Sequence, residues 1–253
     1  MNFTDTKVLG IDFHSQDVYT AIDRLRKGGL LVVPAAPGLV TIMGDKYYYN
    51  ALKASDVAIP DSGYMVLLWN LLHRPKLARI SGLKFIVAFL ADEKVKQESV
   101  YLVNPTPKHE DANITYLRQR GFEKVGYQLS YNAPMYPKGE ALIDQVLLAD
   151  IEEKKPAYIL INLGGGIQEK IGAYLKAHLS YKPTIICTGA AIAFMTGQQT
   201  RIPMWADRLF LGWLMRCLDN PKQYIPRYQA AFKLISLMLK LGPNGPGEKA
   251  ISS

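Results

Sequence analysis

Short apolar runs alternate along this chain with longer segments whose apolar residues recur at helical spacing. The clearest runs, each short enough for a buried strand, lie at residues 30–33, 100–103, 158–163 and 184–187. Segments between them carry the period of amphipathic helices, as at 139–153, where one face holds Leu142, Val146, Leu147 and Ile151. Strands that alternate with helices at this spacing predict an α/β fold on a doubly wound, mostly parallel, Rossmann-like sheet.

Further elements follow from the same patterns with less regular spacing. We expect strands at 8–13, 57–59 and 124–130, and helices at 15–27, 39–54, 64–72 and 110–120. The apolar run at 84–97 suits a buried strand or a helix, and its length and charged second half favour a helix.

The pattern changes after about residue 200, where strand signals stop and helices are predicted at 204–218 and 221–241. Between 201 and 241, seven Lys and Arg residues oppose only Asp207 and Asp219, and aromatic side chains are interleaved with them. This composition is typical of a helix that lies on an anionic membrane surface, although a solvated face over a packed core would also produce it. The predicted division is an α/β core at 1–200, a basic aromatic helical appendage for membrane targeting at 201–241, and a disordered tail at 242–253.

The overall composition narrows the function classes. The 253 residues are 49% hydrophobic, enough to bury a sizeable core, and the net charge of +8 favours an anionic partner. Nucleic acid is the weakest candidate partner, because the cations gather in the aromatic appendage at 201–241 and no nucleic-acid motif is present. Without a signal-peptide pattern or a membrane-spanning apolar run, the chain is predicted to be cytoplasmic or peripheral. The two Cys residues lie in apolar surroundings and the four His residues are scattered, so we expect no disulfide, metal or cofactor.

Candidate chemistry centres on a glycine turn after the predicted strand at 158–163. Gly164-Gly165-Gly166 lets backbone N–H groups approach a ligand, and the following helix points its N-terminus at the same place. Gln168 and Glu169 then lie at the carboxyl end of a strand, where open α/β sheets bind ligands. The same glycine turn could instead be only a tight connection between a strand and a helix. The choice between a ligand-binding turn and a structural turn depends on the rest of the chain.

Four blocks of sequence carry a family resemblance over about residues 8–240. Three of them are Ala54-Ser55-Asp56 through Pro60-Asp61-Ser62-Gly63, then Arg79-Ile80-Ser81-Gly82, then Leu163-Gly164 through Gln168-Glu169. The fourth is the longest and contains Thr188-Gly189-Ala190-Ala191, Gly197, Arg201-Ile202-Pro203, Trp205, the run 211–216, Pro221 and Arg227-Tyr228. These blocks resemble the WecG/TagA/CpsF bacterial glycosyltransferases, glycosyltransferase family 26.

The resemblance implies an inverting, metal-independent enzyme that transfers a hexose or N-acetylhexosamine from a nucleotide sugar, with a UDP-sugar favoured, to a polyprenyl-diphosphate-linked sugar. Such enzymes make exopolysaccharide or cell-wall glycans as peripheral proteins on the inner face of the bacterial membrane, which makes an anionic membrane surface an expected partner. Asp61 matches the family's general base, although a carboxylate beside Ser62 also suits a helix cap. The residues implied in substrate binding are Arg79, Gly164, Gly165, Gln168, Glu169, Thr188, Gly189, Arg201, Arg208 and Arg216.

Four positions depart from the family pattern. They are Pro34-Ala35-Ala36-Pro37 in place of Thr-x-Asn, Ser62 in place of Gly, Asn104-Pro105 in place of a glycine pair, and Gly166-Ile167 in place of Pro-Lys. Loss of the Thr and Asn side chains predicts an unusual donor, or a weakened or lost activity. Because Asp61, Arg79 and Gln168 are kept, changed specificity is favoured over a non-catalytic relative that binds glycan intermediates or scaffolds a synthesis complex. The sequence leaves the sugars, the pathway and a homo-oligomer open.

Overall fold

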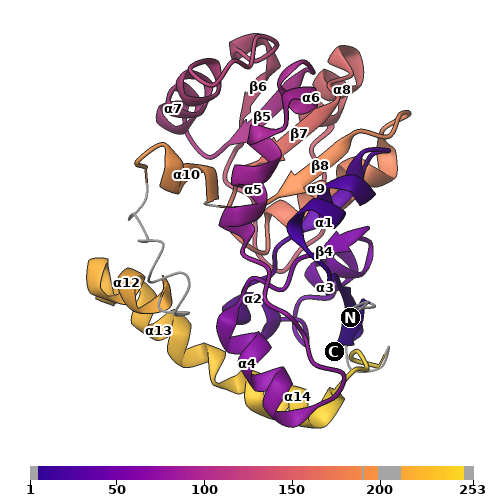
Figure 1. The fold of residues 1–253 in the computed structure, drawn as a ribbon, viewed down its shortest axis with the longest axis vertical. Helices are drawn as coiled ribbons and strands as arrows, with labels where there is room; N and C mark the ends of the chain where they lie inside the picture. Colours follow the sequence, from indigo (N-terminus) through magenta and orange to yellow (C-terminus); the bar gives the residue numbers. More distant parts are fainter. Residues whose placement is uncertain (1–4, 190, 199–211, 248–253) are drawn as a thin grey trace.

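The computed structural model describes residues 5–189, 191–198 and 212–247, which form an eight-stranded sheet with helices on both sides (Figure 1). The strand order is β1-β2-β4-β3-β8-β7-β5-β6. β1 (Thr6–Val8) and β2 (Ile11–Phe13) pair antiparallel, and all other neighbours pair parallel. The other strands are β3 (Gly29–Val32), β4 (Val57–Ala58), β5 (Val100–Asn104), β6 (Ser130–Asn132), β7 (Tyr158–Ile161) and β8 (Thr184–Cys187). The predicted mostly parallel α/β sheet is confirmed.

The central strands are buried on both faces, and successive residues point into two separate cores. In β3, Leu30 and Val32 belong to one apolar cluster and Leu31 to the other, and β5, β7 and β8 alternate in the same way. One cluster is covered by α2 (Ala36–Leu39), α3 (Lys46–Lys53), α4 (Gly63–Leu72), α8 (Gln145–Lys154) and α9 (Gln168–His178). The other is covered by α1 (Val18–Leu25), α5 (Gly82–Ala91), α6 (Glu93–Lys96), α7 (Pro107–Arg118) and α10 (Ala191–Met195).

Capping residues explain where the helices depart from the predicted ranges. The ambiguous run at 84–97 is helical, as favoured, but it breaks at Asp92, whose side chain caps α6. The helix expected from 139 begins only at Gln145, because the Asp144 carboxylate accepts a hydrogen bond from the Leu147 N–H. The helix expected at 39–54 is divided into α2 and α3, and Asp45 caps the second.

The described part of the C-terminal segment forms α12 (Gly212–Asp219), α13 (Pro221–Ala231) and α14 (Lys233–Leu241), so the helix predicted at 221–241 is divided into two. α14 is part of the protein core, because Leu234 and Met238 are fully buried in the cluster that also holds Trp69 of α4. The packed-core alternative therefore holds for α14. Within the described residues, no helix combines the length and the apolar character needed to cross a bilayer.

Residues 242–247, assigned from composition to a disordered tail, instead bind the β1–β2 hairpin. The Leu9 and Gly10 N–H groups donate to the carbonyls of Gly242 and Pro243, each at 2.9 Å. Gly245 packs so tightly that an added Cβ would lie 1.7 Å from the Tyr49 hydroxyl. Residues 242–247 therefore lie beside the β1–β2 hairpin (Figure 1), since backbone hydrogen bonds and a close glycine contact outweigh the polar composition.

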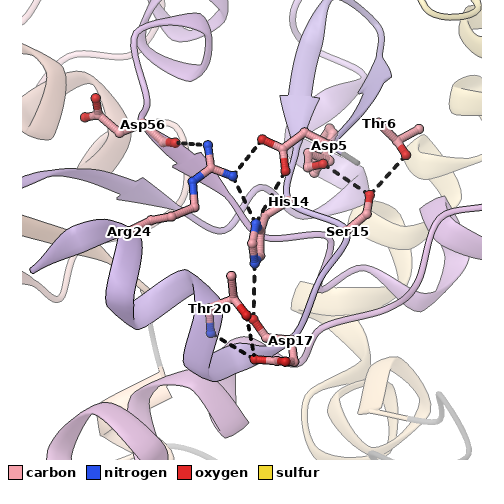
Figure 2. Close-up of polar contacts among 9 residues, drawn as sticks. Asp5, Thr6, His14, Ser15, Asp17, Thr20, Arg24 and Asp56 are labelled. Atoms are coloured by element: carbon pink, nitrogen blue, oxygen red, sulfur yellow. Dashed lines mark hydrogen bonds and ion pairs between the residues drawn. The ribbon is translucent and has the colours of Figure 1, made fainter. Parts of the chain in front are cut away.

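One His side chain is buried at the junction of this hairpin with α1 (Figure 2). His14 Nε2 donates to the Asp17 carbonyl at 3.1 Å, and Arg24 donates to His14 Nδ1 at 3.1 Å. The Asp5 carboxylate binds the same guanidinium at 2.7 Å, and Arg24 also reaches the Asp56 carbonyl next to β4. His14 is thus a structural residue that ties hairpin, helix and sheet together.

Candidate active site

Four adjacent parallel strands, β4, β3, β8 and β7, end at the same edge of the sheet. At a strand spacing of ~4.8 Å their ends span roughly 14 Å, which suits a ligand of nucleotide-sugar size. The loops beyond these ends contain most of the predicted site: Asp61 after β4, residues 34–37 after β3, Thr188 and Gly189 after β8, and residues 164–169 after β7. Ligands of open α/β sheets bind at this edge.

The carboxylate of Asp61 is held by two donors and remains accessible. Its Oδ1 accepts hydrogen bonds from the Gly82 N–H at 3.0 Å and from Arg79 Nη2 at 3.3 Å. Arg79 Nε also donates to the Asp61 carbonyl at 2.7 Å, so one guanidinium fixes both ends of the residue. The Asp61 side chain is 39% exposed and Arg79 is 16% exposed. The geometry gives an oriented carboxylate that a bound molecule can reach.

The helix-cap alternative for Asp61 does not apply, because its neighbour takes that role. The Ser62 hydroxyl accepts from the Met65 N–H at 3.3 Å and caps α4. Asp61 instead faces the first turn of α5, where Gly82 supplies its N–H. A Cβ at Gly82 would lie 3.0 Å from Val33 Cγ1, so glycine is what lets α5 approach this closely.

Gln168 and Glu169 lie near the glycine turn but are buried, and their polar atoms bind the protein itself. Gln168 Oε1 accepts from the Gly189 N–H at 2.7 Å, and Gln168 Nε2 donates to Glu169 Oε1 at 3.1 Å. Glu169 Oε2 accepts from the Gly166 N–H at 2.7 Å. The pair therefore connects the loop after β8 to the loop after β7 and holds the backbone of Gly189 and Gly166 in place.

Burial shifts the pKa of two titratable groups here, the Glu169 carboxyl and the Cys187 thiol. Burial raises the pKa of the Glu169 carboxyl above its usual range, although the Gln168 and Gly166 donors oppose that shift. Burial also raises the pKa of the Cys187 thiol, which donates to the Gln168 carbonyl at 3.3 Å. Both groups are buried, so the connection between the two loops lies away from solvent.

The glycine turn itself is open. Gly164 and Gly165 are exposed, and apart from the adjacent residues of the turn, no atom of the described residues lies within 4 Å of the position that a Cβ would take at either one. α9 begins at Gln168, and the N–H groups just before and at its start are already used: those of Ile167 and Gln168 donate to the Gly164 carbonyl at 3.2 Å each, and that of Gly166 donates to Glu169. Among the described residues, the N–H groups of Gly164 and Gly165 have no acceptor, and such backbone donors suit an anionic group such as a diphosphate.

The remaining predicted residues are only partly located. Thr188 is half-buried, and Gly189 adopts a positive φ of 60° beside Gln168. Arg201 and Arg208 lie outside the described residues. Arg216 belongs to α12, and its side chain also lies outside the description.

Three features of the site were missed from sequence. The Gly82 N–H is a backbone donor, which no side-chain pattern marks. Lys170, buried next to Glu169, pairs with the Asp45 carboxylate at 3.3 Å and so ties α9 to α3. Asn104 is buried at the end of β5, where its Oδ1 accepts from Asn113 at 2.8 Å and from Asn162 at 3.3 Å. Asn at the ends of two predicted strands was the available signal.

Residues 6–244 match the glycosyl transferase WecG/TagA/CpsF family, and the chain belongs to that family. It is similar to N-acetylglucosaminyldiphosphoundecaprenol N-acetyl-beta-D-mannosaminyltransferase of Bacillus spizizenii, with 26% identity over 91% of this chain and 88% of the relative. A protein of the same name from Bacillus subtilis is 24% identical over 73% of this chain and 71% of its own length.

Proposed function

We propose that this protein is an inverting, metal-independent glycosyltransferase that moves a hexose or N-acetylhexosamine from a nucleotide sugar to a polyprenyl-diphosphate-linked sugar. The observation that carries the proposal is the accessible Asp61 carboxylate, oriented by Arg79 and Gly82 at the ligand edge of the sheet. The names of the two relatives describe transfer of N-acetylmannosamine to a lipid-diphosphate-linked sugar, which supports this substrate class. The product would enter bacterial exopolysaccharide or cell-surface glycan synthesis.

In the proposed reaction, Asp61 acts as general base. It accepts the proton of the acceptor hydroxyl while that oxygen attacks the anomeric carbon, and the nucleoside diphosphate leaves from the opposite face. The charge that develops on the leaving diphosphate needs donors, and the backbone N–H groups of Gly164 and Gly165, two exposed residues at the same edge, are proposed to supply them. Arg79 adds a cation beside the base, and Arg201, Arg208 and Arg216 are proposed to bind the diphosphate from the C-terminal segment.

Residues 34–37 lie between the Asp61 side of the edge and the Gly189 side, because β3 separates β4 from β8. Two Pro and two Ala residues offer no side-chain hydrogen bond there, and Ala35 begins α2 without a side-chain cap. This absence favours a donor recognised by fewer polar contacts than in relatives with Thr and Asn. It also motivates the competing function, a non-catalytic relative that binds glycan intermediates or scaffolds the synthesis complex.

Exchange of Asp61 for Asn is the direct test. Asn keeps an oxygen for the Gly82 N–H but is no base, so turnover should fall by about 10²–10⁴-fold while donor binding is retained. Turnover is measured with UDP-N-acetylmannosamine, among a panel of nucleotide sugars, and a synthetic prenyl-diphosphate N-acetylglucosamine. Donor binding is measured as a thermal shift.

The outcomes separate the two functions. Wild-type-like turnover by the Asn variant would remove Asp61 from the mechanism. Donor or acceptor binding without turnover by the wild-type protein, across the panel, would favour the non-catalytic relative. We further propose that the protein works peripherally on the inner face of the bacterial cell membrane, where the acceptor lipid resides.

A further inference from the structure

Two helices that are far apart in the sequence lie side by side at one end of the molecule. The rings of Tyr64, in the first turn of α4, and Phe232, immediately before α14, meet at 6.1 Å. His73, which follows α4, donates from Nε2 to the carbonyl of Met238 near the end of α14 at 3.3 Å. The N-terminal ends of α4 and α14 are thus in contact, and so are their C-terminal ends, which means that the two helices run in the same direction (Figure 1).

Each helix continues this contact with exposed apolar side chains. Leu67 and Leu71 follow Tyr64 by three and seven residues, and Ile235 and Leu239 follow Phe232 by the same intervals. Residues at these spacings share one side of a helix. Leu67 is 72% exposed and Leu71 is 81% exposed, and Phe232, Ile235 and Leu239 are exposed as well. The two stripes therefore form one continuous apolar surface along the α4–α14 junction, called here the α4–α14 face.

The two chain segments that contribute this face carry charge of a single sign. Residues 63–91 and residues 220–247 contain no Asp or Glu, although 22 such residues occur in the chain. The Lys and Arg residues of the two segments are Arg74, Lys76, Arg79 and Lys84, then Lys222, Arg227, Lys233 and Lys240. Except for Arg79, which binds Asp61, and Arg227, whose side chain is outside the description, these cations are exposed.

We infer that the α4–α14 face inserts into the headgroup region of an anionic lipid bilayer, so that the membrane contact is shared by the α/β core and the C-terminal segment. Exposed aliphatic and aromatic side chains with surrounding cations and without carboxylates have the chemistry of a surface-bound amphipathic element. A water-exposed apolar surface of this kind otherwise needs a partner. The uniform positive charge disfavours a second copy of the same face.

The inference rests on the proposed function, and it explains how a lipid-linked acceptor meets the base. α4 starts two residues after Asp61, so with a 1.5 Å rise per residue Leu67 lies within roughly 10 Å of that backbone along the helix. A membrane at the α4–α14 face thus presents lipid headgroups close to the carboxylate. α4 would act as a spacer of fixed length between bilayer and base.

The experiment is flotation of the full-length protein with phosphatidylglycerol-containing vesicles and with pure phosphatidylcholine vesicles. The variant Leu67→Glu/Leu71→Glu is matched by Ile143→Glu/Val146→Glu, two apolar residues that are 68% and 70% exposed near α8, at the other end of the molecule. Because a buried Leu contributes strongly to transfer from water, the first variant should bind anionic vesicles about 100-fold more weakly, whereas its control should bind as wild type does.

A milder variant keeps the test informative if the double Glu change affects folding, which thermal unfolding will show. Lys233→Ser/Lys240→Ser should weaken binding to anionic vesicles by about 30-fold, and should leave the weak binding to phosphatidylcholine unchanged. Undiminished flotation of the folded Leu67→Glu/Leu71→Glu protein would overturn the inference. So would a wild-type dimer that ignores vesicles and dissociates in that variant.

The same samples separate this inference from the proposed function. If the wild-type protein binds vesicles through this face but transfers no sugar, the membrane inference stands and the proposed glycosyltransferase function is wrong. If it transfers sugar to a water-soluble acceptor but binds no vesicle, the function stands and the membrane inference is wrong.

Discussion

The loop after β4 and the loop after β7 lie at the same edge of the sheet, with β3 and β8 between them, yet they use their carboxylates differently. Asp61 is accessible and is oriented by Arg79 and Gly82, which come from the following segment. Glu169 is fully buried, and both of its carboxylate oxygens accept hydrogen bonds from the protein, from the Gly166 N–H and from Gln168 Nε2. Position at a strand end is therefore insufficient to mark a catalytic carboxylate, and exposure decides which one can meet a substrate.

The difference follows from the backbone of each loop. Pro60 restricts the backbone of the β4 loop, and the Asp61 carboxylate accepts its hydrogen bonds from Arg79 and from the start of α5. The β7 loop is a glycine triplet in which Gly166 adopts a positive φ of 88°, and such a flexible segment gains a fixed shape only through added contacts. Glu169 supplies one of these contacts and Gln168 carries the connection on to Gly189. We expect changes on the β4 side to affect chemistry and changes on the β7 side to affect stability first.

After Asp61→Asn, the largest contrast should come from Arg79→Ala. Loss of a charged donor beside Asp61 removes about 1.5–3 kcal/mol per bond, so kcat/KM for the donor should fall by roughly 10–100-fold. Arg79→Lys, the control, keeps the positive charge but not the planar group that reaches two oxygens, and should recover only part of the loss. Steady-state kinetics with both variants is the measurement. Unchanged constants in Arg79→Ala would place the active site elsewhere.

A smaller effect, of the opposite kind, is expected from Gln168→Ala. It leaves the buried Gly189 N–H without its acceptor, which costs about 1–3 kcal/mol of stability. Tm should fall by several degrees, at about 2–4 °C per kcal/mol for a chain of this size. Gln119→Ala, an exposed change at the end of α7, is the control and should leave Tm unchanged. A Gln168→Ala protein with normal Tm but poor donor affinity would show that Gln168 turns outward to bind the donor, as the sequence suggested.

The smallest predicted effect is a pH dependence from Glu169. Burial raises the pKa of this carboxyl, so the folded protein keeps the proton at pH values where the unfolded chain has lost it. This group's contribution to stability therefore falls as pH rises from about 4.5, until the raised pKa of the folded state is passed. Glu169→Gln cannot titrate. The Tm of wild type relative to Glu169→Gln should accordingly decline between about pH 4.5 and the raised value. Parallel Tm curves would contradict a protonated Glu169.

Local sequence determined the main elements and the location of the Asp61 block. Apolar runs of strand length can be buried on both faces only in a sheet covered by helices, so 30–33, 100–103, 158–163 and 184–187 predicted β3, β5, β7 and β8 without tertiary information. The position of Asp61 directly after a predicted strand placed it at the edge where open α/β sheets bind ligands. Helix starts were less certain, because a single capping carboxylate such as Asp144 overrides the periodicity around it.

Tertiary structure decided what each polar group faces. Sequence alone grouped α14 with α12 and α13 by charge, but Leu234 and Met238 pack against α4 because the fold brings that helix alongside. It likewise placed Asp61, as a general base, and Gln168 and Glu169, as substrate-binding residues, at one ligand site, since all three follow strands. Only the tertiary structure shows that Asp61, held by Arg79 and the start of α5, stays accessible, whereas contact with the Gly189 loop and the glycine turn encloses Gln168 and Glu169. Composition and spacing fix which residues reach the edge of the sheet, whereas burial depends on contacts between segments distant along the chain.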